Sequence, residues 1–280
     1  MIRDQGLVSK IWRYAVWAVA GLFILNLIGV IAAVVVNSFA TRWLGTWLPI
    51  GLTTKWYFSA WKEFQLSSVV FVTFQIVFTV VIISGILGVT TAYALARRDF
   101  PGKRLVVLLF LLPLLIPPLT YGIPLATVLY QMGLGGSFWG VVLINLVPSL
   151  PFVVLVMIPF IEQIDPRIEA AARVFGAGTG SLFLRILLPL LLPGMLAALL
   201  LVLVRTIAMF ELTFLIAGPT SQTLVVSLYY AVFAAGVRAG QSIDAMAVIY
   251  MVTTLFWLIL ALQFVNPSQI VARAKQQPAS

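Results

Sequence analysis

The sequence predicts an all-α, polytopic membrane protein, a bundle of six transmembrane helices formed by one domain over residues 1–280. Hydrophobic residues make up 62% of the chain, and its mean hydropathy is +1.12, whereas soluble domains are about 45–50% apolar. The apolar residues form long runs, and about 20 of them in a helix cross a bilayer core of about 30 Å. Basic residues cluster in the short loops between these runs, which argues against nucleic acid as the reason for the net charge of +9.

The first predicted span covers about residues 14–36. It is longer than the apolar region of a signal peptide, which has about 7–15 residues, so we expect an uncleaved anchor. Residues 39–66 then form an aromatic-rich interruption. Its aromatic residues include Trp43, Trp47, Trp56, Tyr57 and Trp61. Because Trp and Tyr favour the membrane–water interface, we expect this segment along the outer face, with an aromatic ligand site as the alternative.

The second predicted span covers about residues 67–96 and ends in a basic turn at residues 97–104. The third, about residues 105–130, is interrupted by prolines. They are Pro113, Pro117, Pro118 and Pro124. Prolines deform a helix, and a deformed helix is tolerated in a membrane where protein or water satisfies the freed carbonyl groups. We therefore expect the third span inside the bundle rather than against lipid.

Three further spans are predicted, at about residues 138–160, 186–216 and 242–264. Turns at residues 131–137 and 217–221 are expected on the outer side, and residues 222–241 form a short outer helix or a re-entrant segment. Residues 67–264 make up the predicted five-helix core.

The distribution of basic residues predicts the orientation. With six spans, both termini lie on one side of the membrane. The basic residues on that side are Arg3, Lys10, Arg13, Arg97, Arg98, Lys103, Arg104, Arg167, Arg173, Arg185, Arg273 and Lys275. Those on the other side are Arg42, Lys55, Lys62 and Arg238. Because cytoplasmic loops carry the excess of Lys and Arg, both termini are predicted to be cytoplasmic.

Residues 162–189 are an unusually charged interruption between two apolar spans. Asp165 can cap a helix whose first position is Pro166. The following residues are strong helix formers, until Gly176 breaks the pattern. Ser181 is predicted to cap a second helix that leads into the next span. The expected product is a short, rigid helix across the cytoplasmic end of the bundle.

This loop carries a recognisable pattern, EAA-x4-G-x9-I-x-LP. Its fixed positions are Glu169, Ala170, Ala171, Gly176, Ile186 and Pro189. The pattern and its place before the penultimate helix resemble the coupling loop of permease subunits of binding-protein-dependent type I ABC importers. The alternative, an ordinary loop, would match so many spaced positions only by accident. The resemblance covers about residues 67–264, with the first span as an extra N-terminal helix.

The resemblance implies a multi-pass subunit of a bacterial inner membrane. Its expected partners are a second permease, expected to be non-identical, two ATP-binding subunits and an extracytoplasmic solute-binding protein. ATP and Mg²⁺ would be bound by the ATPase, so no cofactor is expected in this chain.

The same resemblance implies roles for residues of the loop. Glu169 and the two alanines after it would pack in a groove of the ATPase, and Gly176 would permit the turn. Pro189 would mark where the chain re-enters the membrane. Arg173 would pair with acidic groups of the ATPase, or would serve only the positive-inside rule.

Two ionisable residues, Arg205 and Glu211, fall within the fifth predicted span. Such groups cost at least about 2.5–3.5 kcal/mol on insertion scales, so they face a cavity or a partner. On one continuous helix they would point about 240° apart, and each would need its own neighbour. We expect Glu211 to line the solute path and Arg205 to hold a gate or contact the companion permease. Helix–helix association is the alternative for both.

Three further residues are weaker candidates for the solute path: Asp244, Tyr121 and Asn145. Asp244 opens the sixth span, where it or Ser242 could instead cap the helix. Polar residues of the third, fourth and fifth spans are expected to face one another.

The chemistry available to the chain is narrow. It has no cysteine and no histidine, which excludes disulfides, thiolate metal sites and the usual general base. No metal site and no catalytic residue are predicted. The Gly-rich segment 176–180 lacks the Gly-Lys-Ser/Thr of a phosphate loop, so ATP hydrolysis is expected in a partner.

The expected solute is small and polar. Residues 94–103, before the third span, resemble the same segment of both sugar and polyamine permeases. The length of the chain and its outer aromatic segment favour the polyamine-type permease, and Glu211 and Asp244 would suit a cation. A sugar, sugar acid or opine-like solute is the alternative. An ion-driven transporter, which would show inverted repeats, and an intramembrane enzyme are remote alternatives.

Overall fold

The structure, a computed structural model, describes residues 7–43, 46–233 and 239–264, and it consists of helices joined by turns and loops. Among these residues, five helices are long and apolar enough to cross a membrane, or up to six if one bent pair counts as a span. The predicted all-helical, multi-span class is confirmed. By their contacts, the described residues before 65 form one compact unit with residues 239–249, and residues 65–233 with 250–264 form another.

Part of the charge argument lies outside the described residues, namely Arg3, Arg238, Arg273 and Lys275. The cytoplasmic location of the two termini stays a prediction.

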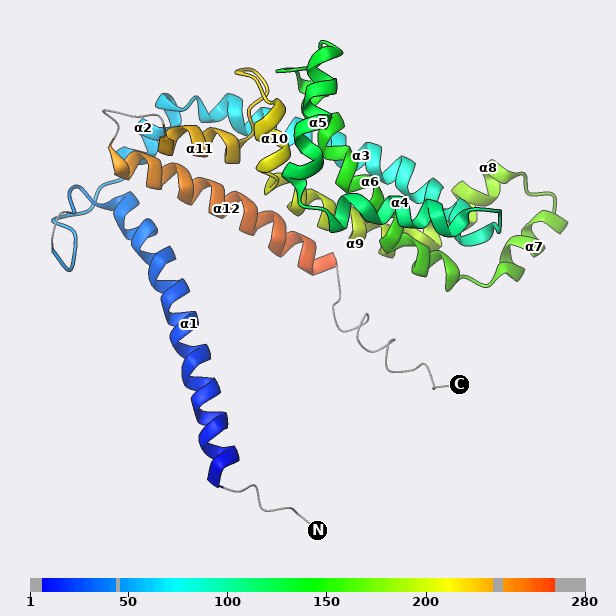
Figure 1. Ribbon diagram of the computed structural model, residues 1–280, viewed down its shortest axis with the longest axis horizontal. Helices are drawn as coiled ribbons and strands as arrows, with labels where there is room; N and C mark the ends of the chain where they lie inside the picture. The colour runs from blue at the N-terminus through cyan, green and yellow to red at the C-terminus, as the bar shows by residue number, and fades with distance from the viewer. Residues whose placement is uncertain (1–6, 44–45, 234–238, 265–280) are drawn as a thin grey trace. The chain divides into compact units, whose positions relative to one another are not determined.

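The second unit is built on three packed helices, α3 (Leu66–Arg97), α6 (Phe138–Glu162) and α9 (Leu188–Ile207). Figure 1 shows them running side by side, with α4 alongside. Glycines permit this packing: a Cβ added at Gly88 of α3 would lie 2.7 Å from the Cβ of Val153 on α6. Small residues at such crossings let membrane helices approach closely.

The third predicted span is two helices, α4 (Lys103–Leu115) and α5 (Pro118–Gln131), bent by 101°. Ile116 and Pro117 between them are extended, with ψ of 136° and 135°. A residue before proline avoids the helical region, and two consecutive prolines therefore separate the helices. Together the two helices are apolar and long enough for one broken span, so the deformation predicted from the prolines is a break between two helices.

The position of α4 differs from the prediction. It has no buried residue, and Leu105, Leu109 and Leu115 are exposed on this chain. The expectation that this span lies in the interior of the chain's own bundle is therefore wrong for α4. In α5, by contrast, Gly122, Ala126 and Leu129 are buried.

The fifth predicted span, residues 186–216, is also not one helix. A continuous helical run, Thr179–Ile207, is followed by a break and then by α10 (Glu211–Ile216). Near the break, the Thr206 hydroxyl donates to the carbonyl of Val202 at 2.8 Å, a bond that competes with the backbone ladder and favours bending. The expectation that Arg205 and Glu211 share one helix is therefore wrong.

The two turns predicted on the outer side meet each other. The Gly136 N–H donates to the carbonyl of Ile216 at 2.9 Å, and the Ser221 hydroxyl donates to the carbonyl of Gly136 at 2.9 Å. After the second turn, α11 (Leu224–Phe233) is the short helix predicted for this region. These bonds fix the ends of α6 and α10 relative to each other.

The first unit contains α1 (Leu7–Phe39) and α2 (Lys55–Glu63), which lies in the aromatic-rich interruption. The indole N–H of Trp56 donates to the carbonyl of Ala40 at 2.7 Å, while Trp47 is 99% exposed. Trp56 is thus bound within the unit. Trp47 is free to lie at the membrane–water interface, as the sequence predicts.

The sixth span, α12 (Gly240–Phe264), begins before both proposed capping residues. In the first unit, Asp244 accepts a hydrogen bond from the Asn37 amide at 2.5 Å, and the Ser242 hydroxyl donates to Glu63 at 3.2 Å. The suggestion that Ser242 or Asp244 caps this helix is therefore wrong, since both tie it to α1 and α2.

Candidate functional site

The predicted coupling helix is α7 (Pro166–Val174), and the sequence explains both of its ends. The Asp165 carboxylate accepts from the N–H of Arg167 at 2.9 Å, and Pro166 occupies the first turn, as expected for a capped start. At the other end, Gly176 has φ +82° and its N–H bonds to the carbonyl of Arg173, while the N–H of Ala177 bonds to that of Ala172. This is a Schellman motif.

Replacing Gly176 with Val is expected to weaken the end of α7. A Cβ there meets nothing within 4 Å, so the cost is the left-handed backbone alone, about 1–2 kcal/mol. Transport-coupled ATP hydrolysis should fall several-fold with normal membrane insertion. Gly178→Val, where φ is −70°, is the matched control, and equal activity of the two variants would contradict the role given to Gly176.

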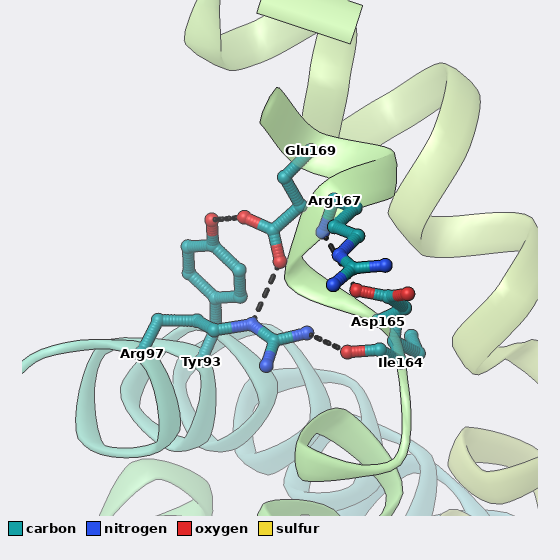
Figure 2. Close-up of polar contacts among 6 residues, drawn as sticks. All are labelled: Tyr93, Arg97, Ile164, Asp165, Arg167 and Glu169. Atoms are coloured by element: carbon teal, nitrogen blue, oxygen red, sulfur yellow. Dashed lines mark hydrogen bonds and ion pairs between the residues drawn. The ribbon is translucent and has the colours of Figure 1, made fainter. Parts of the chain in front are cut away.

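Glu169 fastens α7 to the end of α3. Figure 2 shows its carboxylate between two side chains of that helix: the Tyr93 hydroxyl donates to Oε2 at 2.6 Å, and Arg97 Nε donates to Oε1 at 2.7 Å. Arg97 Nη2 also donates to the carbonyl of Ile164 at 2.6 Å. Glu169 is 8% exposed, so this is a buried, charge-assisted network that holds both α7 and the residues before it.

Tyr93 also contacts the second arm of the loop. Its ring lies edge-on to that of Phe183, with 5.9 Å between the ring centres. Phe183 opens the π-helical turn η1 (Phe183–Leu187), which follows α8 (Thr179–Leu182). Helix α8 begins at Thr179, so the prediction that Ser181 caps it is wrong. The two arms of the loop are thus joined through one tyrosine of α3.

The outward face of α7 differs from the expected one. Ala170, Ala171 and Arg173 are exposed, as a docking surface requires. Val174 and Phe175 are 84% and 90% exposed, which is unusual for apolar side chains outside an interface. The Glu169 carboxylate, which was expected in the groove of a partner, contacts its own chain instead.

Ile186 and Pro189 lie where the loop becomes the fifth span. Ile186 is half-buried in η1, and Pro189 is the second residue of α9. The helical run from Thr179 to Ile207 is continuous, so Pro189 lies within a helix and not at a turn, and re-entry of the chain into the membrane near it stays a prediction. The π-helical turn precedes the proline, whose missing N–H cannot support the regular bonding pattern.

A second group of predicted residues converges at the break between α9 and α10. Arg205 is in the last turn of α9 and Glu211 is the first residue of α10. The Tyr121 hydroxyl is on α5, which packs on the start of α10, because a Cβ added at the neighbouring Gly122 would lie 2.7 Å from Cδ2 of Leu212. That hydroxyl is buried and has no hydrogen-bond partner. The guanidinium of Arg205 lies 5.7 Å from the ring centre of Phe152 on α6.

The other two candidates for the solute path, Asn145 and Asp244, form hydrogen bonds with residues outside this group. The buried Asn145 amide donates to the Val141 carbonyl at 2.9 Å and to Thr213 Oγ1 at 3.0 Å, which ties α6 to α10. Asp244 belongs to the other unit, where Asn37 binds it. Their side chains are engaged in helix packing.

Sequence reasoning missed the partners of Glu169. Arg97 was counted only as a positive-inside residue, and Tyr93 was not considered. Their spacing carries a signal, because residues i and i+4 share one face of a helix. A Tyr–Arg pair at the polar end of an apolar helix could have been proposed as the anchor of the neighbouring loop.

The comparisons with known proteins bear directly on this loop. The sequence profile of the binding-protein-dependent transport system inner membrane component family matches residues 84–270, which include both groups of residues described above. The chain belongs to this family. It is a permease subunit of an ABC importer and a multi-pass membrane protein, not an enzyme.

The names of relatives in this family refer to different solutes. The chain is 37% identical over 160 residues to the molybdenum transport permease ModB of Haemophilus influenzae, which covers 51% of this chain and 69% of ModB. It is 28% identical over 251 residues to the spermidine/putrescine permease PotC of Escherichia coli, with 88% of this chain and 89% of PotC covered. The trehalose permease SugB of Mycobacterium tuberculosis is 30% identical over 158 residues, or 56% and 58% of the two chains.

A solved structure shows the same fold. A chain of a bacterial ABC transporter involved in the import of the acidic polysaccharide alginate matches with a TM-score of 0.75 and 17% identity. The match covers 93% of this chain and 99% of that one. The overall fold of this permease is therefore one that a solved importer chain also has.

Proposed function

We propose that this permease forms the solute path of a binding-protein-dependent importer and receives ATP-driven motion through α7. The proposed partners are a second permease, two ATPases that bind ATP and Mg²⁺, and an extracytoplasmic solute-binding protein. The proposed location is a bacterial inner membrane, with both termini and α7 in the cytoplasm. Residues 67–264 would be the transport core. A solved alginate transporter in complex with its periplasmic protein supports the last partner.

The observation that carries this proposal is the attachment of α7 to α3. A helix that a partner moves transmits this motion to the bundle only if its contacts with the bundle do not break. The Glu169 carboxylate is bonded to Tyr93 and Arg97 in a buried site, while Val174 and Phe175 face outward. One face thus holds the bundle and the other is free to bind an ATPase. Movement of α7 would displace the end of α3, and with it the helices packed on α3.

For the solute, we propose a small polar molecule that carries an amine, with a polyamine-like solute favoured over a sugar. The alignment with PotC extends over 88% of this chain, and Glu211 supplies a carboxylate at the start of α10. A sugar, sugar acid or opine-like solute is the second candidate, favoured by the identity of 30% with the trehalose permease SugB.

Co-purification tests the assignment of partners. A tagged chain extracted in mild detergent should bring with it a protein with phosphate-loop motifs and ATPase activity. Phe175→Glu on α7 should abolish this association, because it places a charge on the outward apolar face. Phe58→Glu, a similarly exposed site on α2, should not. Loss of the ATPase in both variants, or in neither, would contradict docking through α7.

A further inference from the structure

Near the break between α9 and α10 lie polar and charged side chains that, unlike those of an ordinary helix contact, are not paired with one another. The Tyr121 hydroxyl is buried without a partner. Glu211 opens α10 and Arg205 lies in the last turn of α9. Helix α10 packs on α5 next to Tyr121, since a Cβ added at Gly122 would lie 2.7 Å from Cδ2 of Leu212. Among the described residues, neither Arg205 nor Glu211 is in an ion pair. Within a membrane, such groups face a cavity or path and mark sites of function.

The signs of these charges limit what can bind. A guanidinium binds carboxylate, phosphonate or phosphate oxygens with paired N–H donors. A carboxylate accepts hydrogen bonds from an ammonium group, and a phenol hydroxyl can donate a hydrogen bond to a carboxylate, phosphonate or phosphate oxygen. A molecule with only amines would bring a positive charge toward Arg205, and one with only acids would bring a negative charge toward Glu211. A solute with one group of each sign satisfies both.

An aromatic cluster on α10 and α11 includes the residue directly before Glu211 in the chain. Phe210 and Phe214 stack with 5.1 Å between their ring centres, and Tyr229 of α11 lies 4.9 Å from Phe210 and 5.0 Å from Phe214. Glu211 directly follows Phe210 in the chain. Cations bind over the faces of aromatic rings, so this cluster suits an amine at the Glu211 end.

We propose that Tyr121, Arg205 and Glu211 form a subsite for a zwitterion, a small solute that carries an ammonium and an acidic group. Glu211 binds the ammonium, Arg205 binds the acid, and Tyr121 donates to the acid. This rests on the proposed importer function, and it sets aside the polyamine-like solute in favour of one that carries an acidic group as well as the amine.

Three probes of equal carbon number test the charge pattern: putrescine, 4-aminobutyrate and succinate. Binding of each labelled probe is measured on the purified permease–ATPase complex in nanodiscs, without the solute-binding protein, so that selectivity belongs to the membrane subunits. 4-Aminobutyrate should bind at least about tenfold more tightly than either of the other two, which corresponds to about one charged contact.

Variants then separate the two ends. Glu211→Gln should weaken binding of 4-aminobutyrate and putrescine at least about tenfold and strengthen that of succinate, because it removes a repelling charge. Arg205→Gln should weaken binding of 4-aminobutyrate and succinate and strengthen that of putrescine. Glu162→Gln and Arg42→Gln, which change exposed charges elsewhere, are the controls and should alter none of the three.

Tighter binding of putrescine than of 4-aminobutyrate would overturn the zwitterion subsite while leaving the importer assignment intact. Equal binding of all three probes by the unmodified complex would overturn it as well, and this comparison does not depend on how any variant folds. A complex that purifies without an ATPase would instead overturn the proposed function, so the two failures are distinguishable.

Discussion

Replacing Arg97 with Gln is expected to lower solute-stimulated ATP hydrolysis of the importer at least about tenfold, while the permease remains inserted. Arg97 holds both the Glu169 carboxylate and the Ile164 carbonyl, so its loss frees α7 at two points. Removing one partner of a buried ion pair costs about 3–5 kcal/mol, a large penalty for a helix of 9 residues. ATPase activity in proteoliposomes with the solute-binding protein present measures the effect.

A graded series makes this test specific. Arg97→Lys keeps a charge near Glu169 but loses the forked geometry, and it should retain intermediate activity. Tyr93→Phe removes one hydrogen bond to a charged group, worth about 1.5–3 kcal/mol, and should have a smaller effect than Arg97→Gln. The neighbouring Arg98 is exposed, so Arg98→Gln should be close to normal. Full stimulation in Arg97→Gln would show that motion does not enter through this network.

The sequence predicted the helical class and the position of the coupling loop because both depend on local signals. Hydropathy marks the spans regardless of how they pack. The ends of α7 follow from Asp165, Pro166 and Gly176, each of which acts on backbone groups within a few residues. The short helix α11 and the meeting turns at Gly136 and Ser221 lie where the turn residues indicated.

Two of the predicted spans are broken helices, and the breaks could not be placed because the same apolar sequence pattern fits both a continuous helix and a broken one. A proline-rich apolar run can bend or can break, and the extended Ile116 and Pro117 produce a bend of 101° that hydropathy does not register. The break before Glu211 has no Pro or Gly to announce it. Once α9 ends at Ile207, the angle calculated for Arg205 and Glu211 on one helix no longer applies.

Side-chain partners far apart in the sequence were the hardest to predict. Glu169 lies 72 residues from Arg97 and 76 from Tyr93, and a sequence does not state which helix end lies beside which loop. The convergence of Tyr121 with the residues at the α9–α10 break was expected only in outline, from the rule that polar residues of neighbouring spans face one another.

Replacing Gly88 with Val is expected to lower the stability of the packed helices α3 and α6. A Cβ there would lie 2.7 Å from both Cβ and Cγ1 of Val153 and 3.5 Å from the carbonyl oxygen of Leu150. Cβ is fixed to the backbone and the β-branched Val153 is stiff, so α3 and α6 must separate. Overpacking of this kind costs about 1–3 kcal/mol, which should lower the melting temperature in detergent by roughly 5–10 °C.

The same substitution elsewhere separates packing from helix propensity. Gly21 lies in the apolar helix α1, and a Cβ there meets nothing within 4 Å, so Gly21→Val should leave the melting temperature nearly unchanged. Val153→Ala removes the atom Cγ1 that a new side chain at Gly88 would strike, and it should restore part of the stability of Gly88→Val, as coupled neighbours do. If Val153→Ala and Gly88→Val instead lower the stability additively, the two helices do not meet at this pair. The force path from α7 through α3 into α6 would then need another contact, because the approach of α3 to α6 at Gly88 is what lets a displacement of α3 move the helix behind it.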